Sequence, residues 1–243
     1  MKGRKATNSA TSGALAGKVA VVTGASRGIG LAIVNVLMAE HCSLVATSRS
    51  LGQLPKKPRQ DLLCIACDVR DERSVAALFA AVKKQFGHVD ILINNAGMAH
   101  PLRNIADLPL ETWREVLDTN LTGMFLCTRA ALPLMRKGGV IVNNLSVAAR
   151  GVFPGESAYC ASKHGALGLT DTLRAEVRGR GIRVVSLLPG PTATDIWNQF
   201  MPEAPRDKMM SPETVARAVI AAITLPENAT VDELRIGPTE GNV

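Results

Sequence analysis

Tyr159 and Lys163 are the residues whose types and spacing most directly suggest chemistry. Tyr159 is the only tyrosine among 243 residues, and Lys163 follows it at the i+4 position. On a helix the two side chains share one face, one turn apart. A phenol has an ordinary pKa of about 10, and a nearby ammonium lowers that pKa by favouring the phenolate. The pair could exchange a proton with an oxygen atom near neutral pH, although the same spacing is common on helices without a catalytic role.

The glycine-rich stretch TGASRGIG, residues 23–30, is a second candidate site. It follows the apolar run VAVV and precedes a helical pattern, so it lies where a strand passes into a helix. Glycines there let the backbone turn tightly and approach a ligand, and the helix start offers free N–H groups and a positive dipole end. The spacing of Gly24, Gly28 and Gly30 differs from the common G-x-G-x-x-G pattern. We interpret the stretch as a phosphate-binding turn, with a plain turn as the alternative.

Apolar runs alternate with helical patterns from residue 18 onward, and these elements must position both candidate sites. The predicted strands cover 19–23, 43–47, 62–67, 89–97, 139–146, 182–190 and 233–237. The predicted helices cover 28–40, 74–86, 111–136, 157–178 and 211–224. Continuous apolar strands are typical of a parallel sheet covered on both faces. We predict an α/β fold: a flexible N-terminal arm over 1–17 and one doubly wound (Rossmann-type) domain over 18–243, with a seven-stranded, mostly parallel sheet.

Composition and charge argue against several classes of function. The net charge is +7, but aromatic residues make up only 3%, whereas nucleic-acid interfaces usually combine a basic face with aromatic stacking groups. We therefore expect no nucleic-acid partner and interpret the cluster Lys56, Lys57 and Arg59 as solvated. No apolar stretch reaches the roughly 18 to 20 residues of a membrane span, and the N-terminus lacks the apolar core of a secretory signal. We expect no membrane association.

The five cysteines indicate reduced thiols and a cytoplasmic location. Cys64 and Cys67 have the C-x-x-C spacing, but they lie in the strand-like run LLCIAC, where residues i and i+3 point to opposite faces. No second pair completes a zinc site, so we expect buried apolar thiols and no metal.

Four motifs together resemble those of the classical short-chain dehydrogenase/reductase family, over nearly all of residues 18–237. They are TGASRGIG at 23–30, NNAG at 94–97, Tyr159-Cys-Ala-Ser-Lys163 with Ser146 thirteen residues earlier, and PGPTAT at 189–194. Each motif is weak alone, but their order and spacing are highly specific. The resemblance implies hydride transfer between a nicotinamide coenzyme and a carbonyl or alcohol.

The resemblance implies catalytic roles for Asn120, Ser146, Tyr159 and Lys163. Tyr159 would be the acid/base, and Lys163 would lower its pKa and hold the nicotinamide ribose. Ser146 would orient the substrate oxygen. Asn120, in a long helix, would organise a water that relays protons by way of Lys163.

The resemblance also implies a set of coenzyme-binding residues. These are Gly24, Ser26, Arg27, Gly28, Ile29, Gly30, Ser48, Arg49, Asp68, Val69, Asn95, Ala96, Gly97, Tyr159, Lys163, Pro189, Gly190, Thr192 and Thr194. Thr192 is the nearer match for the threonine that bonds the nicotinamide carboxamide, and Thr194 is the alternative. Asp68 matches an adenine-contacting position, and its alternative is a helix N-cap.

The end of the second strand predicts the choice of dinucleotide. An acidic residue there would bond the ribose hydroxyls of NAD, but the sequence reads Ser48, Arg49 and Ser50. The guanidinium groups of Arg49 and Arg27 suit a 2′-phosphate, since such pairs are charge-assisted and often bidentate. We therefore predict NADP(H) as the coenzyme, with solvated surface arginines as the alternative.

Residues 191–210 predict a lid after the sixth strand, with an ordinary surface helix as the alternative. The candidates for an apolar substrate surface are Trp197, Phe200, Met201, Met98, Val147 and Phe153. His100 either touches the substrate or is solvated. The short loop 50–61 predicts a reduced helix between the second and third strands.

We predict an NADP(H)-dependent oxidoreductase that acts on a small carbonyl or alcohol substrate. One alternative is a 3-oxoacyl-thioester (acyl carrier protein) reductase, which the C-terminal sequence ELRIGPTEGNV mildly disfavours. An alternative of another class is a non-catalytic NADP(H)-binding sensor or scaffold. The resemblance further implies a homodimer or homotetramer formed through helices 111–136 and 157–178.

Overall fold

A seven-stranded sheet organises the residues that the computed structural model describes, which are 13–52, 54 and 61–241. Its strands are β1 (Val19–Thr23), β2 (Ser43–Ser48), β3 (Leu62–Ala66), β4 (Val89–Asn94), β5 (Met135–Asn144), β6 (Arg183–Pro189) and β7 (Glu233–Ile236). They lie in the order β3-β2-β1-β4-β5-β6-β7, and every neighbouring pair is parallel. The predicted doubly wound α/β fold is confirmed.

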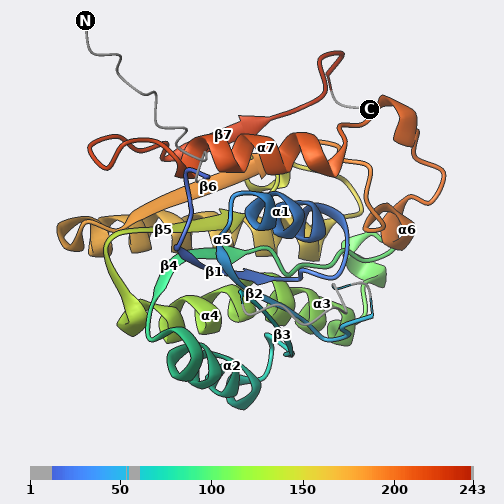
Figure 1. Ribbon diagram of the computed structural model, residues 1–243. Helices are drawn as coiled ribbons and strands as arrows, with labels where there is room; N and C mark the ends of the chain where they lie inside the picture. The colour runs from blue at the N-terminus through green and yellow to red at the C-terminus, as the bar shows by residue number, and fades with distance from the viewer. Residues whose placement is uncertain (1–12, 53, 55–60, 242–243) are drawn as a thin grey trace, which may run out of the picture.

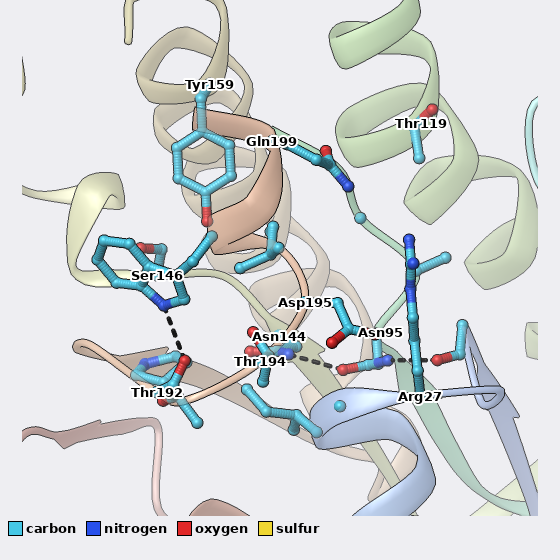
Figure 2. A pocket seen from close by; sticks show the side chains of 18 of the residues that line it. Arg27, Asn95, Thr119, Asn144, Ser146, Tyr159, Thr192, Thr194, Asp195 and Gln199 are labelled. Atoms are coloured by element: carbon cyan, nitrogen blue, oxygen red, sulfur yellow. Dashed lines mark hydrogen bonds between the residues drawn. The ribbon is translucent and has the colours of Figure 1, made fainter. Parts of the chain in front are cut away.

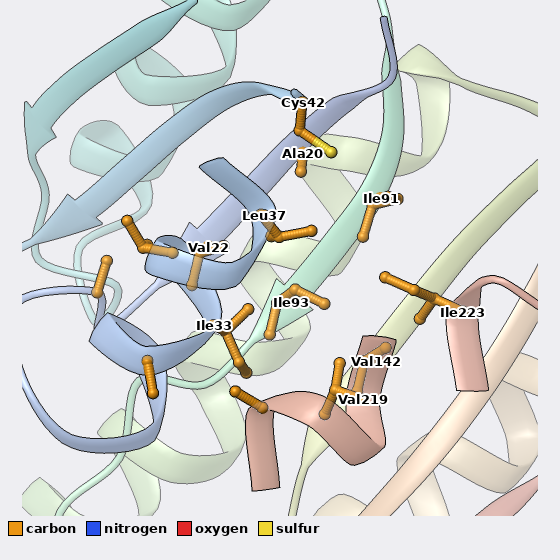
Figure 3. Packing of buried hydrophobic residues seen from close by; sticks show 14 of the residues in the cluster. Ala20, Val22, Ile33, Leu37, Cys42, Ile91, Ile93, Val142, Val219 and Ile223 are labelled. Carbon is orange, nitrogen blue, oxygen red and sulfur yellow. The ribbon is translucent and has the colours of Figure 1, made fainter. Parts of the chain in front are cut away.

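Helices cover both faces of this sheet (Figure 1). They are α1 (Gly28–Ala39), α2 (Glu72–Phe86), α3 (Leu110–Leu117), α4 (Gly123–Ala131), α5 (Ser157–Val177), α6 (Trp197–Phe200) and α7 (Pro212–Ile223). One core joins α1 and α7 to the sheet through residues such as Ile33, Leu37 and Val219 (Figure 3). A second core joins α2, α4 and α5 to the opposite face. Each fully buried Val, Leu or Ile in these cores contributes roughly 1.5–3 kcal/mol.

Local sequence fixes several element boundaries. Asp71 caps α2 by accepting a hydrogen bond from the Arg73 N–H at 3.0 Å, and Gly87 ends that helix in the left-handed region at φ 78°. Ser211 caps α7 in the same way, and Pro212 occupies its first turn, where a missing N–H costs nothing. All five residues of β1 are buried, as expected for a central strand of a covered parallel sheet.

The chain changes direction across the sheet between β1 and β4. From β1 the chain builds β2 and β3 on one side, and then returns to add β4 on the other side. In open α/β sheets a ligand crevice forms beyond the carboxyl ends of the strands at such a switch point. The glycine-rich stretch follows β1 and the NNAG stretch follows β4, so the fold brings them together there.

The predicted helix over 111–136 is wrong in its continuity. The segment divides into α3, a π-helical turn at Asp118–Thr122, α4 and a 3₁₀ turn at Leu132–Leu134. A π turn inserts one residue into the helix without changing the apolar pattern enough to be detected from sequence. β5 already begins at Met135, because Met135 pairs with Val89 across an irregular register, whereas the apolar run that signals the strand starts only at Val140.

The packed chain begins before residue 18. Leu15 is buried in the core of α1, and the Ala14 N–H donates to Glu40 at 2.9 Å, so this part of the predicted arm packs against the end of α1. Arm residues 1–12 and the cluster Lys56, Lys57 and Arg59 lie outside the described residues. Between β2 and β3, the described residues 49–52, 54 and 61 form no helix. Within the described chain, no helix has the length and apolarity to cross a bilayer.

Candidate active site

A cavity of ≈ 580 Å³ opens at the carboxyl edge of the sheet. All the predicted catalytic and coenzyme-binding residues line it except Gly30 and Asn120, which are buried behind the wall. Figure 2 shows Tyr159 and Ser146 at one end and Arg27 at the other. The structure therefore brings the two candidate sites of the sequence into one space.

The glycine-rich turn passes too close to its neighbours to carry a side chain at Gly24 or Gly30. A Cβ on Gly24 would lie 2.7 Å from the Ala96 Cα, and the Gly24 backbone has φ +62°. A Cβ on Gly30 would collide with the Gly24 carbonyl oxygen and the Asn95 side-chain nitrogen. Gly30 thus packs the start of α1 against the turn, while Gly24 and Gly28 face the cavity.

The N-terminus of α1 faces the cavity and presents backbone N–H groups that have no acceptor within the helix. Its N-cap residue, Arg27, makes no side-chain cap hydrogen bond, and no acidic residue lies in the first turn. The first intrahelical bond runs from the Leu31 N–H to the Arg27 carbonyl at 3.2 Å, so the N–H groups before it have no acceptor within the helix. This combination of free N–H groups, dipole and guanidinium suits a phosphate group.

A second basic group lies at the ends of β2 and β3. Ser48, Arg49 and Ser50 line the cavity there, and the Ser48 hydroxyl donates to the Ser50 carbonyl. Arg70, which sequence analysis missed, also lines the wall and binds the Asp68 carboxylate in a bidentate pair, with its shortest contact at 2.7 Å. Hydrogen bonds from Arg70, and more weakly the charge of Arg49, hold the pKa of Asp68 below its ordinary value. Asp68 is not the helix cap that was its alternative, since Asp71 caps α2.

Two asparagines connect the glycine-rich turn to the position of Lys163. The Asn95 amide nitrogen donates to the carbonyls of Thr23 and Gly24, each at 3.1 Å, and its oxygen accepts from the Asn144 side chain at 2.8 Å (Figure 2). The Asn144 backbone carbonyl in turn accepts from the Lys163 Nζ at 3.0 Å. These bonds fix the orientation of both amides, because Asn95 must present its nitrogen to two acceptors.

Asn144 was missed by sequence analysis, although the predicted strand 139–146 would have placed it on the same face as Ser146, two residues later. The amide oxygen of Asn144 is buried at the cavity wall and has no hydrogen-bond partner among the residues that the structure describes. An orphaned buried acceptor is costly, and a ligand donor would remove that cost. The glycine-rich turn, the N–H groups at the start of α1 and this acceptor oxygen together fit a dinucleotide.

Tyr159, Ser146 and Lys163 converge at the other end of the cavity. Ser146 follows β5 and its hydroxyl lies near enough to the Tyr159 phenol to lower the pKa of that phenol, while the Lys163 Nζ lies 5.5 Å from the Tyr159 ring centroid. Burial raises the pKa of Tyr159 to about 12, against the lowering by Ser146. Burial also lowers the pKa of Lys163 to about 8. In the protein alone, the lowered tyrosine pKa that the sequence suggested is therefore absent.

Asn120 lies in the π-helical turn rather than in a continuous helix. Its side chain accepts from the Met98 N–H at 2.8 Å and donates to the Met98 carbonyl at 2.9 Å and the Ser162 hydroxyl at 3.0 Å. It thereby ties the turn to the loop after β4 and to α5. A Cβ on Gly97 would lie 3.4 Å from the Asn120 amide oxygen and 3.8 Å from the Lys163 Nζ, so all three residues are neighbours.

Residues 191–210 cover the substrate end of the cavity, which we define as the wall around Tyr159. This wall comprises Ser146, Val147, Phe153, Tyr159, Trp197, Phe200 and Met201. One side-chain bond joins this segment to the loop after β4, since Gln199 accepts from the Ala99 N–H at 2.9 Å. Two others lie within the segment: the Trp197 indole donates to the Thr192 carbonyl at 2.8 Å, and Arg206 donates to the Thr194 carbonyl at 3.1 Å. Thr192 and Thr194 both line the cavity, so neither is singled out.

Two predicted substrate contacts lie elsewhere. Met98 does not line the cavity and instead accepts a hydrogen bond from the Thr119 hydroxyl on its sulfur at 3.4 Å. His100 is only 2% exposed, and its Nδ1 lies 2.8 Å from the Pro101 carbonyl, so it neither touches the cavity nor is solvated. The loop after β4 turns both side chains inward, which their sequence neighbours do not signal.

None of the five cysteines, all of which the structure describes, forms a disulfide. Cys64 packs toward the core of α1 and Cys67 toward that of α2, on opposite faces of the sheet. Over the described part of the chain, no three His, Cys, Asp or Glu side chains gather as a metal would require.

Comparisons with known proteins identify the family of this chain. The short chain dehydrogenase family model matches residues 18–204. The chain is 37% identical to a farnesol dehydrogenase from Aedes aegypti, covering 92% of this chain and 96% of that protein. It is 34% identical to a 3-oxoacyl-[acyl-carrier-protein] reductase from Synechocystis, covering 90% and 94%. An alcohol dehydrogenase from the archaeon Thermococcus sibiricus, solved with 5-hydroxy-NADP, superposes with a TM-score of 0.84 at 28% identity, covering 93% and 98%.

Proposed function

The chain belongs to the short-chain dehydrogenase family of oxidoreductases, and on this premise we propose that it is an NADP(H)-dependent enzyme that interconverts a carbonyl compound and its alcohol. The observation that carries the proposal is the meeting of Tyr159, Ser146 and Lys163 with the glycine-rich turn in one cavity. Chemistry of this kind needs a proton donor, a group that orients the carbonyl and a dinucleotide site, and all three line the same space.

In the proposed mechanism the coenzyme, when bound, supplies the hydride that reduces the substrate carbon. The Ser146 hydroxyl donates a hydrogen bond to the substrate oxygen and orients the carbonyl. The Tyr159 hydroxyl gives its proton to that oxygen as negative charge develops there. With a pKa of about 12 in the protein alone, Tyr159 holds this proton throughout the neutral range, which suits the direction of reduction. Lys163, held by the Asn144 carbonyl, lies beside the phenol and can resupply the proton.

The choice of NADP(H) rests on the basic group at the ends of β2 and β3. Ser48 and Arg49 replace the acidic residue that would favour NAD, and Arg70 adds a second guanidinium to the same wall. The Thermococcus enzyme, similar to this chain, was solved with an NADP derivative. We include a cytoplasmic location in the proposal, because none of the five cysteines forms a disulfide.

A direct test is to measure NADPH and NADH consumption against a broad panel of ketones, aldehydes and quinones. The Tyr159→Phe variant should lose at least about a hundredfold in kcat, because the proton donor is removed while the ring remains. Its affinity for NADPH, measured by the change in coenzyme fluorescence, should stay within about twofold of wild type. Turnover near the wild-type rate in this variant would refute the assignment of Tyr159.

The panel also separates the alternative functions. A 3-oxoacyl-thioester reductase, which the similarity to the Synechocystis protein favours, would prefer acyl thioesters over simple ketones. A non-catalytic sensor would bind NADPH but oxidise it with no member of the panel. The presence of Asn120, Ser146, Tyr159 and Lys163 together argues for catalysis over the sensor.

A further inference from the structure

Glu156 is a carboxylate on the cavity wall that the proposed chemistry leaves unused. It directly precedes α5, and its charge is near enough to raise the pKa of the Tyr159 phenol. Its backbone is fixed, since its N–H donates to the Phe153 carbonyl at 3.1 Å and its carbonyl accepts from the Cys160 N–H at 2.8 Å. Within 13–52, 54 and 61–241, its carboxylate has no hydrogen bond and no ion pair.

The surroundings of this carboxylate make its isolation costly. Burial raises the pKa of Glu156, and no neighbouring cation opposes that rise. A partly buried acid without a partner loses hydration and gains nothing in return. A substrate that closes the cavity would remove still more water from Glu156, so the carboxylate favours ligands that bring a positive charge.

Aromatic rings are concentrated on the same cavity. The chain has only two tryptophans, one tyrosine and five phenylalanines, and four of these eight rings, Phe153, Tyr159, Trp197 and Phe200, line the cavity. Trp197 and Phe200 lie against each other with ring centroids 4.7 Å apart. Ring faces attract cations, tryptophan most strongly, and quaternary ammonium ligands are typically bound by such rings.

Charge divides the cavity into two ends. The end that suits phosphate groups carries Arg27, Arg49 and Arg70. The cation nearest Tyr159 is Lys163, whose Nζ is engaged by the Asn144 carbonyl. Among the carboxylates on the cavity wall, Glu156 is the one beside Tyr159, whereas Asp68 and Asp195 lie toward the end that suits phosphate groups. The substrate end therefore carries an acid that has no partner within the described chain.

We propose that the substrate carries an ammonium group, which Glu156 and the aromatic rings bind while Ser146 and Tyr159 engage its carbonyl or hydroxyl. This inference rests on the proposed function for its chemistry, but the cation-binding part stands on the cavity alone. The substrate class is an amino ketone or amino alcohol. In the direction of reduction, the carbonyl carbon gains the hydride from NADPH and the oxygen gains the proton from Tyr159, while the ammonium group is unchanged.

The test uses two ketones of the same shape, acetonyltrimethylammonium and neopentyl methyl ketone, which differ only by nitrogen or carbon at the branch point. The ratio of their kcat/KM values with NADPH is measured for wild type, for Glu156→Gln and for Glu213→Gln, an exposed acid on α7 that matches the change in charge. Binding of each ketone to the NADP⁺-saturated protein is measured by calorimetry, because that mixture cannot turn over.

Wild type should prefer the cationic ketone by about tenfold or more, Glu156→Gln should bring the ratio close to one, and Glu213→Gln should leave it unchanged. A ratio near one in wild type, or one that Glu156→Gln does not change, overturns the inference and leaves the proposed function standing. Binding that prefers the cation without any reduction of either ketone supports the inference and counts against the proposed function. If wild type binds neither ketone, the inference is wrong.

Discussion

At the scale of single residues, Arg49 is the side chain on which the choice of coenzyme depends. Arg49→Asp replaces a guanidinium with the carboxylate that would repel a 2′-phosphate and accept from ribose hydroxyls. The ratio of kcat/KM for NADPH to that for NADH should fall by at least about tenfold, since a charge-assisted hydrogen bond is worth about 1.5–3 kcal/mol. Arg217→Asp, an exposed change on α7, is the control. An unchanged ratio in Arg49→Asp would show that Arg49 does not contact the phosphate.

The proposed chemistry needs Lys163 in its charged ammonium form, whereas burial of this side chain disfavours that form. Burial lowers its pKa from 10.5 to about 8, and its side chain is 5% exposed. Below pH 8 both the folded and the unfolded chain hold the proton, and the cost of the buried charge is fully present. Between pH 8 and 10.5 this lysine binds its proton more strongly in the unfolded chain than in the folded chain, so its contribution to the free energy of unfolding rises with pH.

The predicted gain over that interval is up to about 3 kcal/mol for the protein without coenzyme. Lys163→Met should remove the rise and be more stable than wild type at pH 7, although it should lose activity. Urea unfolding at a series of pH values measures this, and Lys84→Met, an exposed change on α2, should keep the wild-type slope. Parallel curves for wild type and Lys163→Met would contradict the account.

At the scale of elements, one side-chain hydrogen bond joins residues 191–210, which we predict to act as a lid, to the loop after β4. The Gln199 side chain on α6 accepts from the Ala99 N–H, and Ala99 is buried. Gln199→Leu keeps the volume but leaves that N–H without an acceptor, which costs about 1–3 kcal/mol. The lid should open more often.

Trypsin should then cleave after Arg206 or Lys208 at least about fivefold faster in Gln199→Leu, because a loss of about 1–3 kcal/mol raises the population of the open segment by at least that factor. Substrate KM should rise with it. Glu203→Gln, an exposed change in the same segment, serves as the comparison. Equal cleavage rates in all three proteins would mean that Gln199 does not fasten the lid.

The elements also show what a sequence can and cannot predict. The strands were predictable because buried parallel strands are continuous apolar runs, as in β1 and β6. The division of 111–136 was not, because the π turn at Asn120 comes from contacts with Met98 and Ser162 that are distant in sequence. Asn144 and Glu156 escaped notice for the same reason: their roles depend on which partners they find, or lack, across the cavity.

At the scale of the whole molecule, we expect the chain to assemble through α4 and α5. Phe125 on α4 is 42% exposed, so an apolar ring lies on the surface of that helix. The Arg129 guanidinium lies 5.1 Å from the centroid of this ring. Exposed large apolar side chains often mark interfaces. Light scattering should give a mass of two or four times 25.7 kDa.

Phe125→Glu should lower that mass, because a charge in an apolar interface loses its hydration. Ile105→Glu is the matched control, since Ile105 is 78% exposed but lies outside both helices. If Phe125→Glu and wild type have the same mass, Phe125 is not part of an interface.

A row of polar side chains runs through the middle of the molecule. The Asn94 amide donates to Thr128 on α4 and to Asn143 on β5, and Asn143 donates to Thr170 on α5, each at 2.9 Å. If β4 shifted by one residue relative to β5, these buried polar groups would lose their hydrogen-bond partners in an apolar interior. That loss costs roughly 1–3 kcal/mol for each group. The row therefore fixes the register of β4 and β5. Asn95, Asn144 and Ser146 lie at the ends of these two strands, so this edge of the sheet keeps its geometry before any ligand binds.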